Sequence, residues 1–308
     1  MYISEDYLTW KNSTEQRDEG FKLAYIDGNP LRWFFGYLEG KYAFRIEAKD
    51  CLLRPVFKSS KAIEVGIYPD SKKLTILFEL IDDDFKQQFI GLFENLIDCS
   101  ISFDMSEKAV KAVAKSYLRW SKLFSADSPL LSESQIQGLF GELTFIVEES
   151  SIRGINEVVK SWCGIDFEEV DFVFPDTWAE IKTKSRLRST VTISSPGQLD
   201  HANDGHLFIY SVDCDDAGIS LNDLFNHVLE MIRETGDVVL EDGFRRRLED
   251  FGYYVLPVYD KPRYLISERR EYLVSFGFPI VKRNVMLPNI KSIKYELIID
   301  SLEQWRIK

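Results

Sequence analysis

The sequence predicts an α+β or α/β fold in which a β-rich N-terminal domain precedes a mixed β-sheet flanked by helices. Short runs of alternating apolar and polar residues, separated by turn residues, fill the region from 31 to 80. From Ser132 onward, the helix and strand signals follow an α-β-β-β-α-β-α order. A chain of 308 residues is long enough for two domains that each bury a core.

The N-terminal domain, expected over 1–125, is predicted to have four strands closed by two helices. Glu39-Gly40 and Pro69-Asp70 are turn signals between strands. The strands are expected at 31–38, 42–48, 62–67 and 73–80, and the helices at 83–97 and 106–124. The small and polar residues that follow predict a linker at 125–129.

The second domain, expected over 126–308, begins with a well-signalled helix. Ser132 and Gln135 have the spacing of an S-x-x-Q capping box, which satisfies the free backbone N–H groups of a first turn. Gly138 and Gly141 follow within the helix, where a glycine costs about 1 kcal/mol relative to alanine. We therefore expect both glycines to allow close packing of this helix against the sheet.

The remaining strand and helix signals of this domain follow in order. Strands are expected near Trp162, in a hairpin at 170–184, and at 190–194 and 206–212. A short helix is expected from Ser195, and a longer one over 220–234 that ends at Gly236. The last part of the chain returns to β-like alternation at 253–259, 272–276 and 292–299.

The predicted hairpin carries acidic residues on one face. Pro175-Asp176 is expected to form a two-residue turn. Antiparallel pairing outward from this turn sets Asp171 directly opposite Glu180. Directly opposed Cβ atoms lie about 4.5 to 5.5 Å apart, and like charges at that distance repel. A three-residue loop would shift the register by one and move Asp171 off this face.

A lysine shares the face of the two acids. Lys182 lies two residues beyond Glu180, so the period of a strand returns its ammonium to the same side, while Ile181 points to the opposite, buried side. A divalent cation would turn the repulsion of the acids into attraction, and a metal-dependent phosphodiesterase needs such an arrangement. The alternative is a solvated sheet face on which Lys182 pairs with its cross-strand neighbour Glu169.

Composition limits the classes of function. Lys and Arg number 38 and Asp and Glu number 50, a net charge of −12, so the global field repels nucleic acid unless basic residues gather on one surface. The four cysteines form no C-x-x-C pair, which suits reduced thiols better than disulfides or structural zinc. The start of the chain has no signal-peptide pattern and no apolar run reaches about 18 residues, so we expect a soluble cytoplasmic protein.

Three segments of the second domain resemble the PD-(D/E)xK nuclease superfamily. They are G-L-F-G-E-L at 138–143, W-A-E-I-K-T at 178–183 and S-S-P-G-Q-L at 194–199. More narrowly, they look like an uncharacterised bacterial family of that superfamily, whose genes often sit in restriction or phage-defence clusters. The resemblance covers about 128–236 and implies a restriction-endonuclease-like core, followed by a C-terminal β-rich extension.

The resemblance implies a two-carboxylate metal site. Asp171 and Glu180 would hold Mg²⁺, for which Mn²⁺ could substitute, together with the backbone carbonyl of Ile181. Lys182 would orient or activate water. One departure from the pattern is that Asp171 does not follow a proline, whereas the literal Pro175-Asp176 pair lies at the turn, too close to Glu180 to reach the same face.

The resemblance also implies that Glu142 and Gln198 act beside the metal, Glu142 as an outer acid. Each has a simpler alternative. Glu142 lies at the margin of its helix's apolar stripe, where a solvent-facing glutamate is common. Gln198 completes an S-x-x-Q capping box with Ser195, which accounts for a glutamine without any role in catalysis.

Three basic residues follow the hairpin in alternation. Lys184, Arg186 and Arg188 would form a ridge beside the acids if the strand continued, and such a ridge suits the phosphates of a nucleic acid. The alternative is an exposed loop of solvated charges.

These features together predict a Mg²⁺-dependent endonuclease, acting on DNA in a restriction or phage-defence setting. Its partners would be nucleic acid and, because cutting both strands normally needs two active sites, a second copy of the chain or a defence-system protein; no membrane is implied. The alternative is a non-catalytic nuclease-like module that serves as a DNA-binding or assembly subunit of a multi-protein complex, which suits the acidic charge.

Overall fold

The computed structural model describes residues 4–13, 19–124, 130–163, 170–285 and 289–308, so the predicted linker at 125–129 lies outside the described residues. The chain divides into two compact units, Met1–Pro129 and Leu130–Lys308. The elements of the first unit are α1 (Glu5–Asn12), β1 (Gly20–Ala24), β2 (Leu31–Leu38), β3 (Lys41–Lys49), β4 (Ile63–Pro69), β5 (Lys73–Leu80), η1 (Asp83–Phe85), α2 (Lys86–Ser100) and α3 (Ser106–Leu123).

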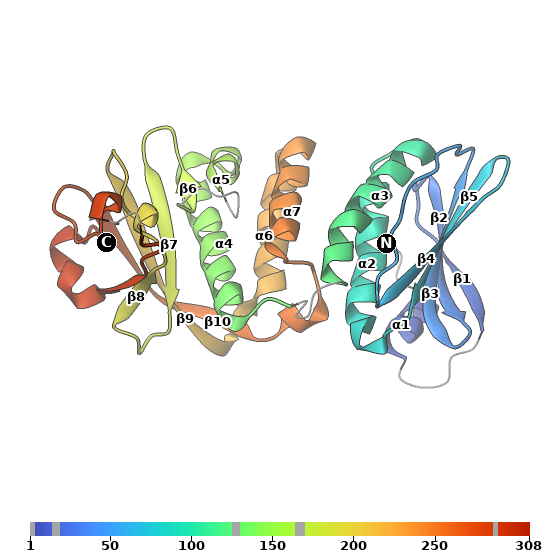
Figure 1. Ribbon diagram of the computed structural model, residues 1–308, viewed down its shortest axis with the longest axis horizontal. Helices are drawn as coiled ribbons and strands as arrows, with labels where there is room; N and C mark the ends of the chain where they lie inside the picture. Colours follow the sequence, from blue (N-terminus) through green and yellow to red (C-terminus); the bar gives the residue numbers. More distant parts are fainter. Residues whose placement is uncertain (1–3, 14–18, 125–129, 164–169, 286–288) are drawn as a thin grey trace. The chain divides into compact units, whose positions relative to one another are not determined.

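The first unit is a five-stranded antiparallel sheet in the order β1-β2-β3-β5-β4. The four predicted strands and two predicted helices are confirmed. The sequence did not predict α1 or β1, because both are short and neither has a clear apolar period. Figure 1 shows α2 and α3 together on one side of the sheet, and Phe44 of β3 packs toward them, with its ring centroid 4.9 Å from that of Phe89.

The opposite face of this sheet carries a charge cluster centred on Glu47, which is 6% exposed. Its carboxylate pairs with Arg32 at 3.5 Å, Arg45 at 3.4 Å and Lys73 at 3.0 Å. The guanidinium of Arg45 also lies over the ring of Phe34, 4.4 Å from its centroid. Glu47 is therefore a buried acid surrounded by cations.

The second unit contains two sheets and four α-helices within its described part. Its elements are α4 (Glu133–Arg153), α5 (Ile155–Ser161), β6 (Phe172–Val173), β7 (Trp178–Lys184), β8 (Thr190–Ile193), η2 (Pro196–Gln198), β9 (Gly205–Ser220), α6 (Leu221–Glu234), α7 (Val238–Phe251), η3 (Pro257–Asp260), β10 (Arg263–Val274), η4 (Arg283–Val285), β11 (Tyr295–Ile298) and η5 (Ile299–Trp305).

The larger sheet of this unit is mixed and has the order β10-β9-β7-β6, with β7 and β9 parallel and the other pairs antiparallel. The smaller sheet pairs β11 with β8. Figure 1 shows α4 on one side of the larger sheet and β8 on the other. A shared apolar core, which includes Ile193 of β8 and Leu207 and Ile209 of β9, joins the two sheets.

Helix α4 begins as predicted, since Ser132 and Gln135 form a complete capping box. The expectation for Gly141 is also confirmed: a Cβ there would lie 2.4 Å from Cγ2 of Thr183 on β7, so only glycine permits this approach. The expectation for Gly138 is wrong, because a Cβ there would meet nothing within 4 Å.

The predicted strand at 253–259 is also wrong. Pro257 has no N–H to give to a sheet ladder and opens the 3₁₀-helix η3. The apolar residues Tyr253, Tyr254, Leu256 and Tyr259 are buried and Val255, Pro257 and Val258 are exposed, a pattern that resembles the alternation of a strand without being one. The strand that follows is β10, and the predictions at 206–212, 272–276 and 292–299 match parts of β9, β10 and β11.

Candidate active site

The hairpin has the register that the sequence predicts. Phe172 pairs with Ala179 and Val173 with Trp178, and the N–H of Phe174 donates to the carbonyl of Thr177 at 2.8 Å, which closes a two-residue turn. Continuing outward by one position brings Asp171 opposite Glu180. At Asp171 the backbone no longer pairs with β7. Its carbonyl accepts a hydrogen bond from the N–H of Cys163 at 2.9 Å instead.

The side chain of Asp171 replaces its backbone as the partner of β7. Its Oδ2 atom accepts a hydrogen bond from the N–H of Ile181 at 2.7 Å. This bond uses one carboxylate oxygen and fixes the side chain against the strand, next to Glu180. The carbonyl of Ile181, which the resemblance assigns to the metal, belongs to the same residue.

Glu180 and Lys182 form an ion pair within the protein. Lys182 Nζ lies 2.5 Å from Glu180 Oε1, and the Glu180 side chain is 0% exposed. The second oxygen, Oε2, is buried and accepts no hydrogen bond within the part of the chain that the structure describes. The predicted alternative partner of Lys182, Glu169, lies outside the described residues. A buried carboxylate oxygen without a partner is costly unless something else binds it.

The charges of this cluster are not balanced. Burial raises the pKa of Glu180 well above its usual value, the Asp171 carboxylate raises it further, and Lys182 opposes both. Burial also raises the pKa of Asp171, against the opposing effects of Lys182 and the Ile181 N–H. Burial lowers the pKa of Lys182, but Glu180 and Asp171 outweigh this and raise it. The single ammonium therefore stays charged among acids that compete for it.

A third acid, Glu142 of α4, joins the cluster. Its Oε2 accepts from Nε1 of Trp162 at 2.7 Å, so the side chain does not face solvent freely. Burial and then the Asp171 carboxylate raise the pKa of Glu142 to about 8, while Trp162 and Lys182 oppose the shift. The structure thus brings Glu142, Asp171, Glu180 and Lys182 together, as the resemblance implies.

The donor set fits a hard divalent cation held by few protein ligands. Asp171 and the unpartnered Oε2 of Glu180 supply carboxylate oxygens, and Ile181 supplies a carbonyl. Mg²⁺ typically takes one or two carboxylates and keeps several waters. Among the described residues, no group of three or more His, Cys, Asp or Glu side chains is placed to hold a metal. Glu142, bonded to Trp162, therefore stands as a neighbour of the site and not as a third carboxylate ligand.

Gln198 does not join the acids in this conformation. Its Oε1 accepts from the N–H of Ser194 at 2.8 Å, and no hydrogen bond among the described residues connects it to Asp171 or Glu180. The capping-box alternative is wrong, because the Ser195 side chain makes no capping hydrogen bond, and a role of Gln198 beside the metal stays a prediction. Gln198 holds the turn between β8 and η2.

The predicted basic ridge is wrong. Strand β7 ends at Lys184, and a turn closed by Arg188 N–H donating to Ser185 carbonyl at 3.0 Å follows it. Lys184 is only 7% exposed, and Arg188 pairs with Glu296 at 2.7 Å. Arg186 is exposed, and its N–H donates to Asp213. Alternating residues share a face only while the strand continues, so a role of these three side chains on nucleic acid stays a prediction.

The sequence missed Tyr295 of β11. It pairs with Ile193 of β8 and its hydroxyl is buried, without a hydrogen bond of good geometry in the described chain. Burial raises the pKa of Tyr295; the Val281 backbone and Lys182 lower it, and Asp200 and Glu180 raise it. The phenol therefore lies in the field of the acid cluster. Only the pairing of β11 with β8 reveals this, and no local pattern signals it.

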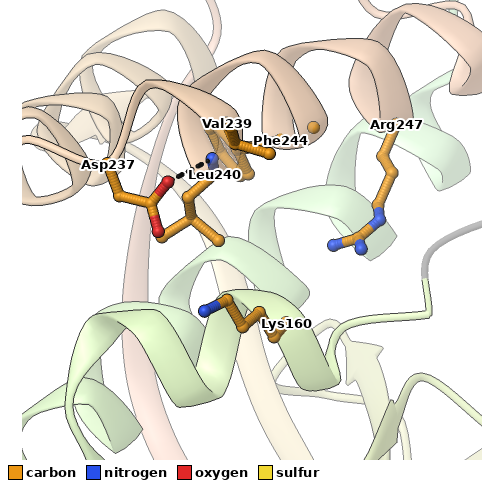
Figure 2. A pocket seen from close by; sticks show the side chains of 7 residues that line it. Lys160, Asp237, Val239, Leu240, Phe244 and Arg247 are labelled. Atoms are coloured by element: carbon orange, nitrogen blue, oxygen red, sulfur yellow. Dashed lines mark hydrogen bonds between the residues drawn. The ribbon is translucent and has the colours of Figure 1, made fainter.

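A pocket of about 320 Å³ lies apart from the acids, between α5 and α7. Figure 2 shows Lys160 and Arg247 on opposite sides of it and Asp237 capping the N–H of Leu240. Phe244 in its wall packs at a tilt against Trp162, with ring centroids 5.7 Å apart. The pocket contains none of the cluster acids, so we place the candidate active site at the acid cluster.

Comparison with known proteins identifies the family. No helix in the described ranges is long and apolar enough to cross a membrane. Searches of curated proteins and of solved structures gave no match. One family model, with the description "Putative PD-(D/E)XK family member, (DUF4420)", matches residues 41–300. The match extends over most of the chain and agrees with a mixed sheet flanked by helices. The chain therefore belongs to the DUF4420 family and has a PD-(D/E)XK-type, restriction-endonuclease-like fold.

Proposed function

We propose that this protein is a metal-dependent endonuclease that hydrolyses phosphodiester bonds, with DNA as substrate and Mg²⁺ as cofactor. The observation that carries the proposal is the buried Glu180, whose Oε1 lies 2.5 Å from Lys182 and whose Oε2 has no partner in the described chain. A neighbouring acid and an unpaired carboxylate oxygen do not stabilise an ion pair that is only structural. In a cation site, both groups can bind the cation. The expected setting is restriction or phage defence in the cytoplasm.

Each residue of the acid cluster would have a separate role in the reaction. Asp171, Glu180 and the Ile181 carbonyl would hold the cation, whose chemistry when bound is to neutralise phosphate charge and acidify water. Lys182, oriented by Glu180, would stabilise negative charge that develops on the reacting oxygens. Glu142, held by Trp162, would exchange a proton near neutral pH.

A cleavage assay tests the proposal. The purified protein is expected to nick or cut plasmid DNA with Mg²⁺ or Mn²⁺, and EDTA is expected to abolish this. Lys182→Ala should abolish cleavage, and because it removes the cation paired with buried Glu180 it should also lower the melting temperature, so rates are compared per folded molecule. Lys41→Ala is the matched control, since Lys41 pairs with a strand glutamate, Glu79, at 2.9 Å in the first unit. The proposal fails if calorimetry detects no divalent ion and DNA, RNA and methylated DNA stay intact.

The second candidate is a non-catalytic module that assembles with other proteins. The net charge of unit Leu130–Lys308 favours this second candidate, since the unit contains 20 lysines and arginines and 30 aspartates and glutamates. A protein that binds DNA by itself is usually basic. This reading predicts metal binding without cleavage, or neither, and the same assay separates the two.

A further inference from the structure

The acidic charge of the second unit raises the question of how a phosphodiester approaches its acids. The unit Met1–Pro129 has 18 basic and 20 acidic residues, a net charge of −2, whereas Leu130–Lys308 has a net charge of −10. Such a field repels a polyanion on average. A nucleic acid can therefore bind the second unit only where cations gather locally.

Two stretches of the second unit have four cations and no acids, 181–199 and 281–294, and in the first of them Lys182 and Arg188 are already paired. Between residues 281 and 294 there are four basic side chains, Lys282, Arg283, Lys291 and Lys294, and no aspartate or glutamate. We call these four residues the basic cluster. All four are exposed. Within the described ranges, the ammonium groups of the three lysines make no ion pair and no hydrogen bond. Their charge is therefore available to a ligand.

The first end of the basic cluster is fixed beside η2. The N–H of Arg283 donates to Asp200 Oδ2 at 2.7 Å, and its Nη2 donates to the carbonyl of Gly197 at 3.4 Å. Asp200 lies at the end of the turn that contains Gln198. The Asp200 carboxylate contributes to raising the pKa of the buried Tyr295 hydroxyl. This end of the cluster is thus attached to the η2 turn.

The second end of the cluster leads directly into β11. Lys294 precedes Tyr295, the first residue of β11, which pairs with Ile193 of β8. The Tyr295 ring packs against the core between the two sheets, on the side of β7 that carries Glu180 and Lys182. The Val281 backbone, next to Lys282, also lowers the pKa of Tyr295, so both ends of the cluster lie next in sequence to residues at the Tyr295 side chain.

We propose that the basic cluster binds the phosphodiester backbone of the nucleic acid strand that enters the acid site. This inference rests on the proposed function. It replaces the ridge that the sequence suggests, in which Lys184 is buried and Arg188 is already paired with Glu296. Exposed lysines without carboxylate partners suit phosphates, because binding releases counterions and breaks no protein ion pair.

The test measures binding without catalysis. Labelled duplex DNA, single-stranded DNA and duplex RNA of one sequence are titrated with the full chain in EDTA, by fluorescence anisotropy, over a series of KCl concentrations. The variant carries Lys282→Gln, Lys291→Gln and Lys294→Gln and keeps Arg283. The control variant carries Lys49→Gln, Lys61→Gln and Lys72→Gln, three exposed lysines of the first unit.

The triple variant is expected to bind roughly 10- to 100-fold more weakly near 0.1 M salt. Its slope of log K against log salt should be shallower by up to about 2.7, at about 0.9 for each lost phosphate contact. The control variant should match the wild type. The nucleic acid that shows this difference identifies the backbone that the cluster binds.

Equal affinities and slopes for the triple variant and the wild type would overturn the inference, and so would a wild type that binds none of the three nucleic acids. The proposed function is judged separately, by cleavage with Mg²⁺. Binding that depends on the lysines in a protein that never cleaves would support the basic cluster and reject the nuclease. Cleavage by a wild type whose binding ignores the lysines would do the reverse.

Discussion

In the described parts of both units a glutamate is buried in a central strand, and the surroundings of the two glutamates differ. Glu47 of β3 is 6% exposed and is surrounded by Arg32, Arg45 and Lys73. Glu180 of β7 is 0% exposed, has one cation, Lys182, and leaves one oxygen without a partner in the described chain. It also has two acidic neighbours, Asp171 and Glu142.

The difference shows that burial of an acid does not by itself indicate function. The carboxylate of Glu47 is compensated by the protein, so its burial needs no ligand to explain it. The carboxylate of Glu180 is compensated only in part, so its pKa is raised and it favours the uptake of a proton or a cation. The local balance of charge, more than exposure, separates a structural acid from a candidate catalytic one.

The largest expected effect of this difference is on cleavage. Glu180→Gln should lower the proposed metal-dependent cleavage at least about 100-fold, or about 2.7 kcal/mol, because it removes a proposed cation ligand and the partner of Lys182. Glu47→Gln should leave the rate per folded molecule unchanged. Initial rates on supercoiled plasmid check both. Equal losses in the two variants would remove the distinction between the acids.

The next effect is on stability without metal and has opposite signs at the two sites. Glu47→Gln should lower the free energy of unfolding by about 1–2 kcal/mol, since partly exposed cations lose their partner. Glu180→Gln should raise it by about 1 kcal/mol, since it removes a buried, poorly compensated charge. Urea unfolding in EDTA measures both, and a stabilising Glu47→Gln would contradict the assignment.

The pH dependence of stability should reveal the excess acid. The pKa of Glu142 rises from 4.5 to about 8 on folding, so between these values the folded state holds more protons than the unfolded state. Metal-free stability should therefore fall as pH rises through this window, by about 1–2 kcal/mol after allowance for partial exposure. Melting curves in EDTA at several pH values test this. Glu142→Gln should flatten the slope, and an unchanged slope would assign it to other groups.

The smallest expected effect concerns Asp171. Asp171→Asn keeps an oxygen for the Ile181 N–H and removes one charge, so metal-free stability should rise by about 0.5–1 kcal/mol. Any rise in melting temperature with Mg²⁺ should disappear, since that rise depends on binding to the folded state. Thermal melts with and without Mg²⁺ measure this. Retention of the metal-induced rise would move the cation site away from Asp171.

Local signals were enough to predict the parts of the site that lie close together in sequence. The Pro175-Asp176 turn and the period of a strand set the register that brings Asp171 opposite Glu180 and leaves Lys182 beside it. The capping box gave the start of α4, and the position of Gly141 predicted its close approach to β7.

The parts that the sequence did not reveal depend on contacts over long distances in the chain. The sequence suggests that Lys184 is a surface lysine, yet it is buried, and its ammonium donates to the carbonyls of Ser185 and Arg186 in the turn that follows β7. Tyr295 lies in the field of the acid cluster because β11 pairs with β8, a strand about a hundred residues earlier in the sequence. Gly138, by contrast, has the same spacing signal as Gly141 but faces open space, because helix rotation decides which side meets the sheet.

The hydrogen bond from Ile181 N–H to Asp171 Oδ2 has a spectroscopic consequence. One backbone amide of β7 has a side chain as acceptor in a place where a sheet normally offers a carbonyl, so its proton reports directly on the state of that carboxylate. A change in the charge or position of Asp171 should shift the Ile181 amide resonance and alter its exchange with deuterium, while the amides of Ala179 and Thr183 change little. A single nuclear magnetic resonance signal can therefore follow the site during a titration with a diamagnetic cation.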